Sequence, residues 1–334
     1  MSAATTTATA GTGTRRGRTA GRFAEVAQRR GSVVVLVLVV VVASVVFDDF
    51  ASLRNAENIA VQSSFLAVIA LGMTFVIITG GIDLSVGSVF ALGGVVTAWA
   101  SQYGTLAALG VPLALCGGIG LVNGLLVTRV RMAPFIVTLA SLLFARGLLL
   151  ALSDGGQTTY LVPDGTALTV LGRGSVLGLP WPVVVVVGLY ALGALVLQRT
   201  GYGQTVLAVG GGEDASRLMG LAVDRTKLLA YTSSGLLAGF AGTMSTARSG
   251  AGVTIVGVGL ELTAISAVVI GGTLLTGGAG STGGTLAGVV LLGVIANIIN
   301  QVGSLDSSYQ LVVNGAFLVA VVVVQTLLAR RQSP

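Results

Sequence analysis

The sequence contains no histidine, one cysteine (Cys116) and one lysine (Lys227). Without histidine the chain has neither histidine-based catalysis nor a His/Cys zinc site, and one cysteine forms no internal disulfide. A P-loop needs a lysine followed by serine or threonine, whereas Lys227 is followed by Leu228. The segment GAGSTG at 278–283 has dinucleotide-motif spacing, but no strand is expected before it. We therefore expect no metal, no cofactor and no ATP hydrolysis by this chain.

Charge is also scarce. Charged residues make up 9% of the chain and hydrophobic residues 54%, whereas an ordinary water-facing surface has roughly 25–35% charged side chains. This composition predicts an integral membrane protein of the all-α class. The net charge of +6 comes largely from arginines near the two ends, which favours membrane-flanking charge over nucleic-acid binding.

Apolar runs of about twenty residues predict ten transmembrane helices. The expected spans are 31–48, 57–79, 84–101, 105–127, 134–152, 177–198, 228–248, 261–276, 284–302 and 308–328. Residues 1–30 are rich in Thr, Ala, Gly and Arg and have little apolar surface, so we expect a disordered tail. Residues 31–330 are expected to form a single transmembrane domain.

The distribution of positive charge predicts the orientation. With ten spans and a cytosolic N-terminus, 14 arginine and lysine residues fall on the cytosolic side and 3, namely Arg54, Arg173 and Arg248, on the outer side. Cytosolic loops of membrane proteins carry such an excess of positive charge. We therefore expect a multi-pass protein with both termini in the cytosol.

Two segments of the chain resemble each other. GIDLSVGSVFALGG at 81–94 and GLELTAISAVVIGG at 259–272 share an acid, a leucine, a hydroxyl residue and a closing pair of glycines at the same spacing. Under the expected topology the two copies enter the membrane from opposite sides. The sequence thus predicts an inverted repeat of helices 2–5 and 7–10, and paired breaks of this kind point to a transport pathway.

The two repeated acids, Asp83 and Glu261, stand at the start of apolar segments. One interpretation is that each caps a helix by accepting hydrogen bonds from free backbone N–H groups. Hydroxyl residues follow each acid, and they are candidates either for lining or supporting a weakly polar path or for hydrogen bonding between helices. They are Ser85, Ser88, Thr263 and Ser266.

Arg146 lies inside the fifth expected span. A buried arginine in a membrane helix normally has a partner or faces an aqueous path. Asp154 and Asp164 are the candidate partners, and contact with a substrate and snorkelling to the outer face are the alternatives.

The loop between the sixth and seventh spans contains GGGEDASRLMGLAVDR at 210–225. Glu213 and Asp214 suit the first turn of a short helix, Arg217 a later turn and Gly220 its end. Leu218 and Met219 leave an apolar edge, which indicates a docking element for a soluble partner. The alternative is a solvated loop.

Four segments together resemble the permease subunit of bacterial ribose-type monosaccharide ABC importers, a family related to branched-chain amino acid permeases. They are GMTFVIITGGIDLSVGS at 72–88, GLVNGLLVTRVRMAPFIVTLASLLFARGL at 120–148, AVGGGEDASRLMGLAVDRTK at 208–227 and ELTAISAVVIGGTLLTGGAGSTGGTLAG at 261–288. The resemblance implies a type II importer fold, a second permease copy, a separate ATP-binding subunit and an extracytoplasmic sugar-binding protein. It also implies that Glu213 through Gly220 form the coupling helix, in which Asp214 replaces the family's usual small residue.

The function expected from this resemblance is transport of a monosaccharide across the bacterial cytoplasmic membrane. Alternating access would be driven by the separate ATPase. An ion-coupled secondary transporter, with Asp83 and Glu261 as proton carriers, is the alternative, although it leaves the docking loop unexplained. A membrane enzyme is a third class, for which the sequence offers no nucleophile, base or metal cluster.

Overall fold

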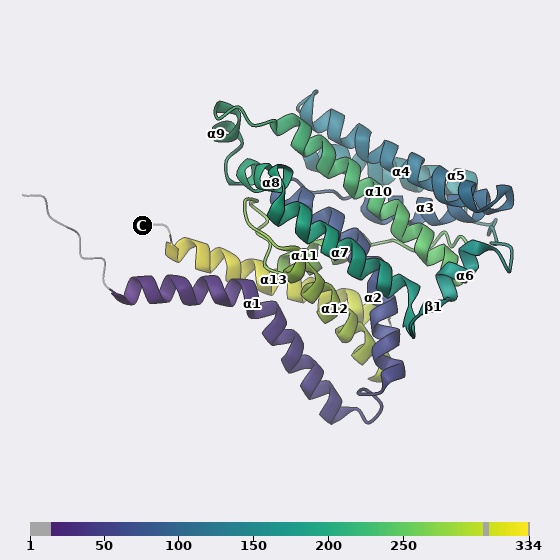
Figure 1. Cartoon of the computed structure of the whole chain (residues 1–334), viewed down its shortest axis with the longest axis horizontal. Helices are drawn as coiled ribbons and strands as arrows, with labels where there is room; N and C mark the ends of the chain where they lie inside the picture. The colour runs from purple at the N-terminus through teal and green to yellow at the C-terminus, as the bar shows by residue number, and fades with distance from the viewer. Residues whose placement is uncertain (1–14, 303–306, 333–334) are drawn as a thin grey trace, which may run out of the picture.

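Helices make up most of the structure, a computed structural model that describes residues 15–302 and 307–332. Figure 1 shows α9 and β1 at opposite ends of the molecule. The helices are α1 (Arg15–Val46), α2 (Leu53–Ile78), α3 (Val86–Ala100), the 3-10 turn η1 (Ser101–Tyr103), α4 (Thr105–Thr128), α5 (Pro134–Leu152), α6 (Ala167–Arg173), α7 (Trp181–Arg199), α8 (Gly201–Gly211), α9 (Glu213–Leu218), α10 (Val223–Ser249), α11 (Leu260–Ile270), α12 (Thr282–Val302) and α13 (Ser307–Gln332). A two-stranded antiparallel hairpin, β1 (Ser175–Val176) and β2 (Leu179–Pro180), precedes α7.

Five helices of the described residues, α2, α4, α5, α7 and α12, are long and apolar enough to cross a membrane. Shorter apolar helical stretches are Gly31–Val46, Leu260–Ile270 and Val312–Val323. The chain is thus an all-α, polytopic membrane protein, as its composition predicted. The number of ten spans stays a prediction.

Several elements differ from the expected spans. The first helix starts at Arg15, so residues 15–30 of the expected tail are helical, while residues 1–14 lie outside the described residues. The division of the chain at residue 30 stays a prediction. Helix α11 ends at Ile270 rather than at 276, because Gly271 and Gly272 follow and Gly272 has a φ of 90°, which stops a right-handed helix. Helix α8 falls in the segment expected to be a loop.

The contacts between helices support the repeat. Exchanging α2, α3, α4 and α5 for α10, α11, α12 and α13 converts one set of neighbours into the other. Thus α10 packs on α4 and α3, as α2 packs on α12 and α11; α3 packs on α4 and α5, as α11 packs on α12 and α13. The two long helices α2 and α10 also contact each other, which places them at the centre of the repeat.

Glycines allow these helices to approach closely. A Cβ atom added to Gly120 of α4 would lie 2.4 Å from the carbonyl oxygen of Tyr231 in α10. One added to Gly288 of α12 would lie 2.1 Å from the carbonyl oxygen of Ala267 in α11. Even alanine would therefore force these helix pairs apart.

Candidate functional site

The chain breaks between α2 and α3, and Asp83 lies in that break with no exposed surface. Its Oδ1 accepts hydrogen bonds from the backbone N–H of Ser85 at 3.0 Å and from the Ser85 hydroxyl at 2.6 Å. Its Oδ2 accepts one from the hydroxyl of Ser234 in α10 at 2.8 Å. The carboxylate therefore holds the start of α3 and fastens it to α10.

This network continues into two further helices. The amide of Asn123 in α4 donates to the Ser85 hydroxyl at 3.2 Å, and the hydroxyl of Ser141 in α5 donates to the Asn123 amide oxygen at 2.5 Å. Hydrogen bonds thus join the break to α4, α5 and α10. Sequence reasoning missed Ser234, Asn123 and Ser141, because single polar residues within apolar spans carry no motif.

The second break comprises residues 250–259, between α10 and α11. Glu261 is the second residue of α11, whose N-cap is Gly259 at a φ of 75°. The start of α11 lies against the start of α3, since a Cβ atom added to Gly87 would come within 2.4 Å of the Oε2 of Glu261. The two copies of the repeated motif therefore meet inside the molecule, in the arrangement of discontinuous helices that surrounds transport sites.

Neither acid occupies the N-cap position itself, but Asp83 accepts the backbone N–H of Ser85 at the start of α3, as the capping interpretation expected. The N-cap of α3 is Ser85, two residues after Asp83, and no side-chain cap hydrogen bond is made by Ser85 or Gly259. Glycines at positive φ, Gly80 before Asp83 and Gly259 before Glu261, set the chain direction at the breaks. Both acids still lie at helix starts, where the helix dipole favours negative charge.

Arg146 of α5 does not contact the expected partners. Its guanidinium donates to the carbonyl oxygens of Thr254 at 2.9 Å and Val256 at 3.2 Å, in the second break. Asp164 instead lies 3.8 Å from Arg173. Arg146 therefore holds the loop that leads into α11, near the charge of Glu261.

Three of the four candidate hydroxyl residues bond mainly within their own segments. Ser85 belongs to the Asp83 network, while Thr263 and Ser266 donate to carbonyl oxygens one turn earlier in α11, at 3.2 and 2.7 Å. Ser88 and Ser266 are buried. Thr263 is half-buried and lines a cavity of about 420 Å³.

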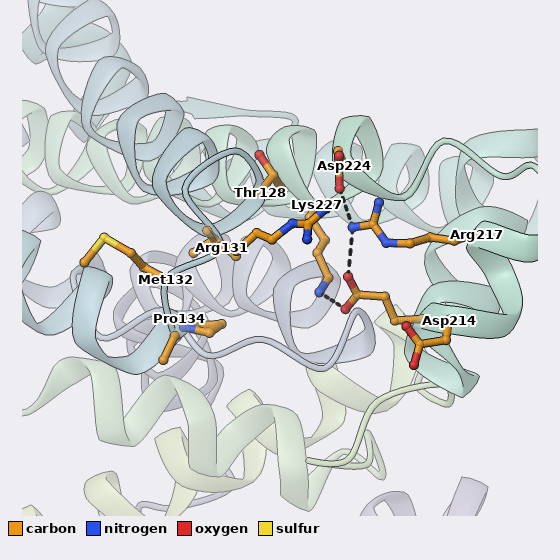
Figure 2. A pocket seen from close by; sticks show the side chains of 11 residues that line it. Thr128, Arg131, Met132, Pro134, Asp214, Arg217, Asp224 and Lys227 are labelled. Carbon is orange, nitrogen blue, oxygen red and sulfur yellow. Dashed lines mark hydrogen bonds and ion pairs between the residues drawn. The ribbon is translucent and has the colours of Figure 1, made fainter.

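At the opposite end from the β-hairpin, α9 forms from the residues expected to be helical. Its terminal glycine, Gly220, has a φ of 78°. Arg217 bridges Oε1 of Glu213 at 3.1 Å and Oδ1 of Asp224 in α10 at 2.5 Å, and Lys227 of α10 pairs with Oε2 of Glu213. Figure 2 shows the side chains of Arg217, Asp224 and Lys227 close together. The network clamps α9 to the first turns of α10.

Electrostatics favour the charged forms of this network. Partial burial of Glu213 opposes ionisation, but the hydrogen bonds and charges of Lys227 and Arg217 outweigh it and hold the pKa of Glu213 below its ordinary value. The hydrogen bond from Arg217 lowers the pKa of Asp224. Leu218 and Met219 take no part in these ion pairs, and 89% and 67% of their surface is exposed. Helix α9 thus exposes an apolar edge while the ion pairs hold the helix to α10.

The family model described as "Branched-chain amino acid transport system / permease component" matches residues 55–322. The ribose import permease protein RbsC of Bacillus subtilis is 39% identical over 93% of this chain and 95% of the relative. RbsC of Escherichia coli K12 is 37% identical over 88% of this chain and 92% of the relative. The L-arabinose permease AraH of Azospirillum brasilense is 35% identical over 91% of this chain and 89% of the relative. This chain belongs to that permease family. No solved structure matches it.

The permease brings together most of the residues singled out from its sequence. Asp83 and Ser85 share one network, Glu261 meets Gly87, and Arg146 holds the same region from α5. The residues of α9 lie apart from them, joined through α10, which carries both Asp224 and Ser234.

Proposed function

We propose that this chain is the membrane subunit of an ATP-driven importer that carries a monosaccharide across the bacterial inner membrane. The printed names of its relatives, ribose and L-arabinose permeases, support this substrate class. The importer contains a second permease copy, a separate ATP-binding subunit and an extracytoplasmic sugar-binding protein. In this proposal the chain binds no nucleic acid and catalyses no reaction, and both of its termini are cytosolic.

The observation that carries the proposal is the geometry of α9. A six-residue helix that exposes Leu218 and Met219 and is clamped to α10 by ion pairs is suited to docking on a soluble partner. Arg217 and Glu213 orient the helix, and Asp214 stands exposed beside the apolar edge. Gly220 lets the chain turn back into α10.

Movement of α9 reaches the helix breaks through α10. This helix receives the ion pairs at Asp224 and Lys227 and, further along, bonds Asp83 through Ser234. Closure of the ATP-binding subunits would pull α10 and change how the starts of α3 and α11 sit against each other. Alternating access follows if these starts close the path in one state and open it in the other.

The residues at the two breaks line or support the path in this proposal. Asp83, Ser85 and Ser88 hold the start of α3; Glu261, Thr263 and Ser266 do the same for α11; and Arg146 fixes the intervening loop. A monosaccharide carries no net charge, so hydroxyl and backbone groups suffice along its route.

Reconstitution tests the proposal against ion-coupled transport. Proteoliposomes containing the chain, its ATP-binding subunit and its sugar-binding protein should take up radiolabelled D-ribose or L-arabinose only when ATP is supplied on the cytosolic side. Ionophores that collapse proton and sodium gradients should leave uptake unchanged. Uptake without ATP that ionophores abolish would instead establish the secondary transporter.

A further inference from the structure

The cavity that Thr263 lines is walled by four helices. It has a volume of about 420 Å³, within the roughly 300–1,000 Å³ typical of small-molecule sites. Its lining residues come from α2, α11, α12 and α13, and they are Gln62, Ser63, Leu66, Leu260, Thr263, Leu292, Gly293, Ala296, Gln310 and Asn314.

The chemistry of this lining is unusual for a membrane protein. Three carboxamides, Gln62, Gln310 and Asn314, line the cavity, and none of its lining residues is charged. The amide nitrogen of Gln310 also donates to the Asn300 amide oxygen at 3.0 Å. An amide left without hydrogen-bond partners in lipid costs several kcal/mol, roughly 4–8 by transfer to a hydrocarbon. The cavity is therefore suited to water or a neutral polar ligand rather than to lipid chains.

One hydroxyl in the wall needs a partner. Ser63 is 6% exposed, and its Oγ makes no hydrogen bond within the described residues. It lies directly against Gly293, where an added Cβ atom would come within 2.0 Å of that oxygen. A buried hydroxyl without a partner is costly, but this oxygen lies against α12, so the groups that can bind a ligand in the cavity are its amides.

A second cavity lies at the connection between α1 and α2 and shares no lining residue with the first. Along α2, Asn55 and Asn58 precede Gln62 on the same side of the helix, and with Gln301 of α12 they line this second cavity of about 760 Å³. The two cavities are thus separate, and Asn58 lies outside the one that Gln62 lines.

We propose that this amide-lined cavity binds the neutral sugar on its way to the helix breaks. This inference rests on the proposed function. Carboxamides offer both donors and acceptors, so Gln62, Gln310 and Asn314 can pair with sugar hydroxyls in several orientations. Pairing by groups without charge suits a site that must release its ligand again, and it leaves the choice among sugars to the binding protein.

Uptake by the reconstituted complex gives the first test, with radiolabelled D-ribose and L-arabinose as the probes. Gln62→Leu and Asn314→Leu should each lower sugar uptake per ATP hydrolysed about tenfold, the size expected when one or two hydrogen bonds to a neutral ligand are lost. Asn58→Leu, one turn earlier in α2, is the matched control and should keep the ratio within about twofold. Normal ratios in both cavity variants, with uptake by the unmodified complex intact, would overturn this inference alone. Failure of the unmodified complex to take up either sugar would overturn the proposed function as well.

Thiol labelling gives a second test that requires no transport. The only native cysteine, Cys116, is fully buried, so Gln62→Cys introduces the one accessible thiol. It should react with a membrane-impermeant maleimide added outside, as Asn58→Cys should. An unreactive Gln62→Cys beside a reactive Asn58→Cys would show that lipid or protein fills the cavity, and would end the proposal.

Discussion

Gly87 in the first turn of α3 lies against Glu261 in the first turn of α11. A Cβ atom at Gly87 would be 2.4 Å from the Glu261 Oε2 and 2.4 Å from the carbonyl oxygen of Gly257. This contact joins two segments 174 residues apart in the chain, each belonging to one copy of the repeated motif. The repeat therefore does more than duplicate helices, because it brings both breaks to a single point.

The first prediction follows from this contact. Gly87→Ala should destabilise the permease by about 1–3 kcal/mol, because backbone and carboxylate must shift to admit the methyl group. Gly118→Ala in α4 is the control, since an added Cβ there meets no atom within 4 Å. Thermal unfolding of the detergent-solubilised protein should show a lower midpoint only for Gly87→Ala. Equal midpoints would show that the two helix starts do not lie in contact.

Asp83 provides a second prediction, which separates a structural role from proton carriage. Asp83→Asn should retain substantial uptake, because the amide oxygen can accept both Ser85 hydrogen bonds and the Ser234 hydroxyl can rotate to accept from the amide nitrogen. Asp83→Leu should fail, since it leaves buried donors unpaired at about 1–3 kcal/mol each. Uptake at matched expression is the measurement. A folded, assembled but inactive Asp83→Asn would favour proton carriage, because an amide does not titrate.

Apolar spans and the repeated motif were readable in the sequence because burial in a membrane demands long apolar helices. The same reasoning located α9, whose acids, arginine and glycine follow the order of a short helix. It also paired the two breaks, because the acid, the leucine and the hydroxyl recur at one spacing. The fold class and the position of α9 could thus be predicted from local sequence patterns.

Contacts between distant segments could not be predicted from the sequence. Arg146 bonds the carbonyl oxygens of Thr254 and Val256, and any residue supplies a carbonyl, so no side-chain pattern marks that partner. Gln62 and Asn314 lie in separate spans and look like isolated polar residues until the fold puts them around one cavity. Helix α8 was missed because its glycines and short length mimic a loop.

The third prediction concerns coupling. Arg217→Glu should abolish uptake and sugar-stimulated ATP hydrolysis, because it places a third negative charge between Glu213 and Asp224 and releases α9 from α10. A bulky acidic residue at Gly220 should have the same effect, since its φ of 78° disfavours side chains. Arg225→Glu, at an exposed position of α10, is the control. Membrane insertion should be normal in all three, and normal ATPase stimulation in the first two would remove α9 from the mechanism.

The fourth prediction concerns pH. The pKa values of Glu213 and Asp224 are both lowered by their cationic partners. A carboxylate with a depressed native pKa contributes stability above its ordinary pKa, near 4 here, and loses it as pH falls through the native value. Hydrogen exchange of α9 should therefore be constant from neutral pH down to about 5, after correction for intrinsic rates, and protection should fall below about 4. Glu213→Gln should weaken the contact between α9 and α10 already at neutral pH, and hydrogen exchange in this variant should depend less on pH. Protection of α9 in the unmodified protein that stays high through pH 3 would contradict the role of the ion pairs.

The last prediction concerns orientation. If the positive-inside distribution is right, α9 is cytosolic and the segment after α5 is outside. Ser216, although it lies in the right loop, is a poor labelling position because it is buried. Asp214 and Thr158 are both exposed and give a matched pair. In intact cells an impermeant maleimide should label Thr158→Cys and spare Asp214→Cys, which should react only after permeabilisation. The reverse pattern would invert the membrane orientation and place α9 beyond the reach of any cytosolic ATP-binding subunit.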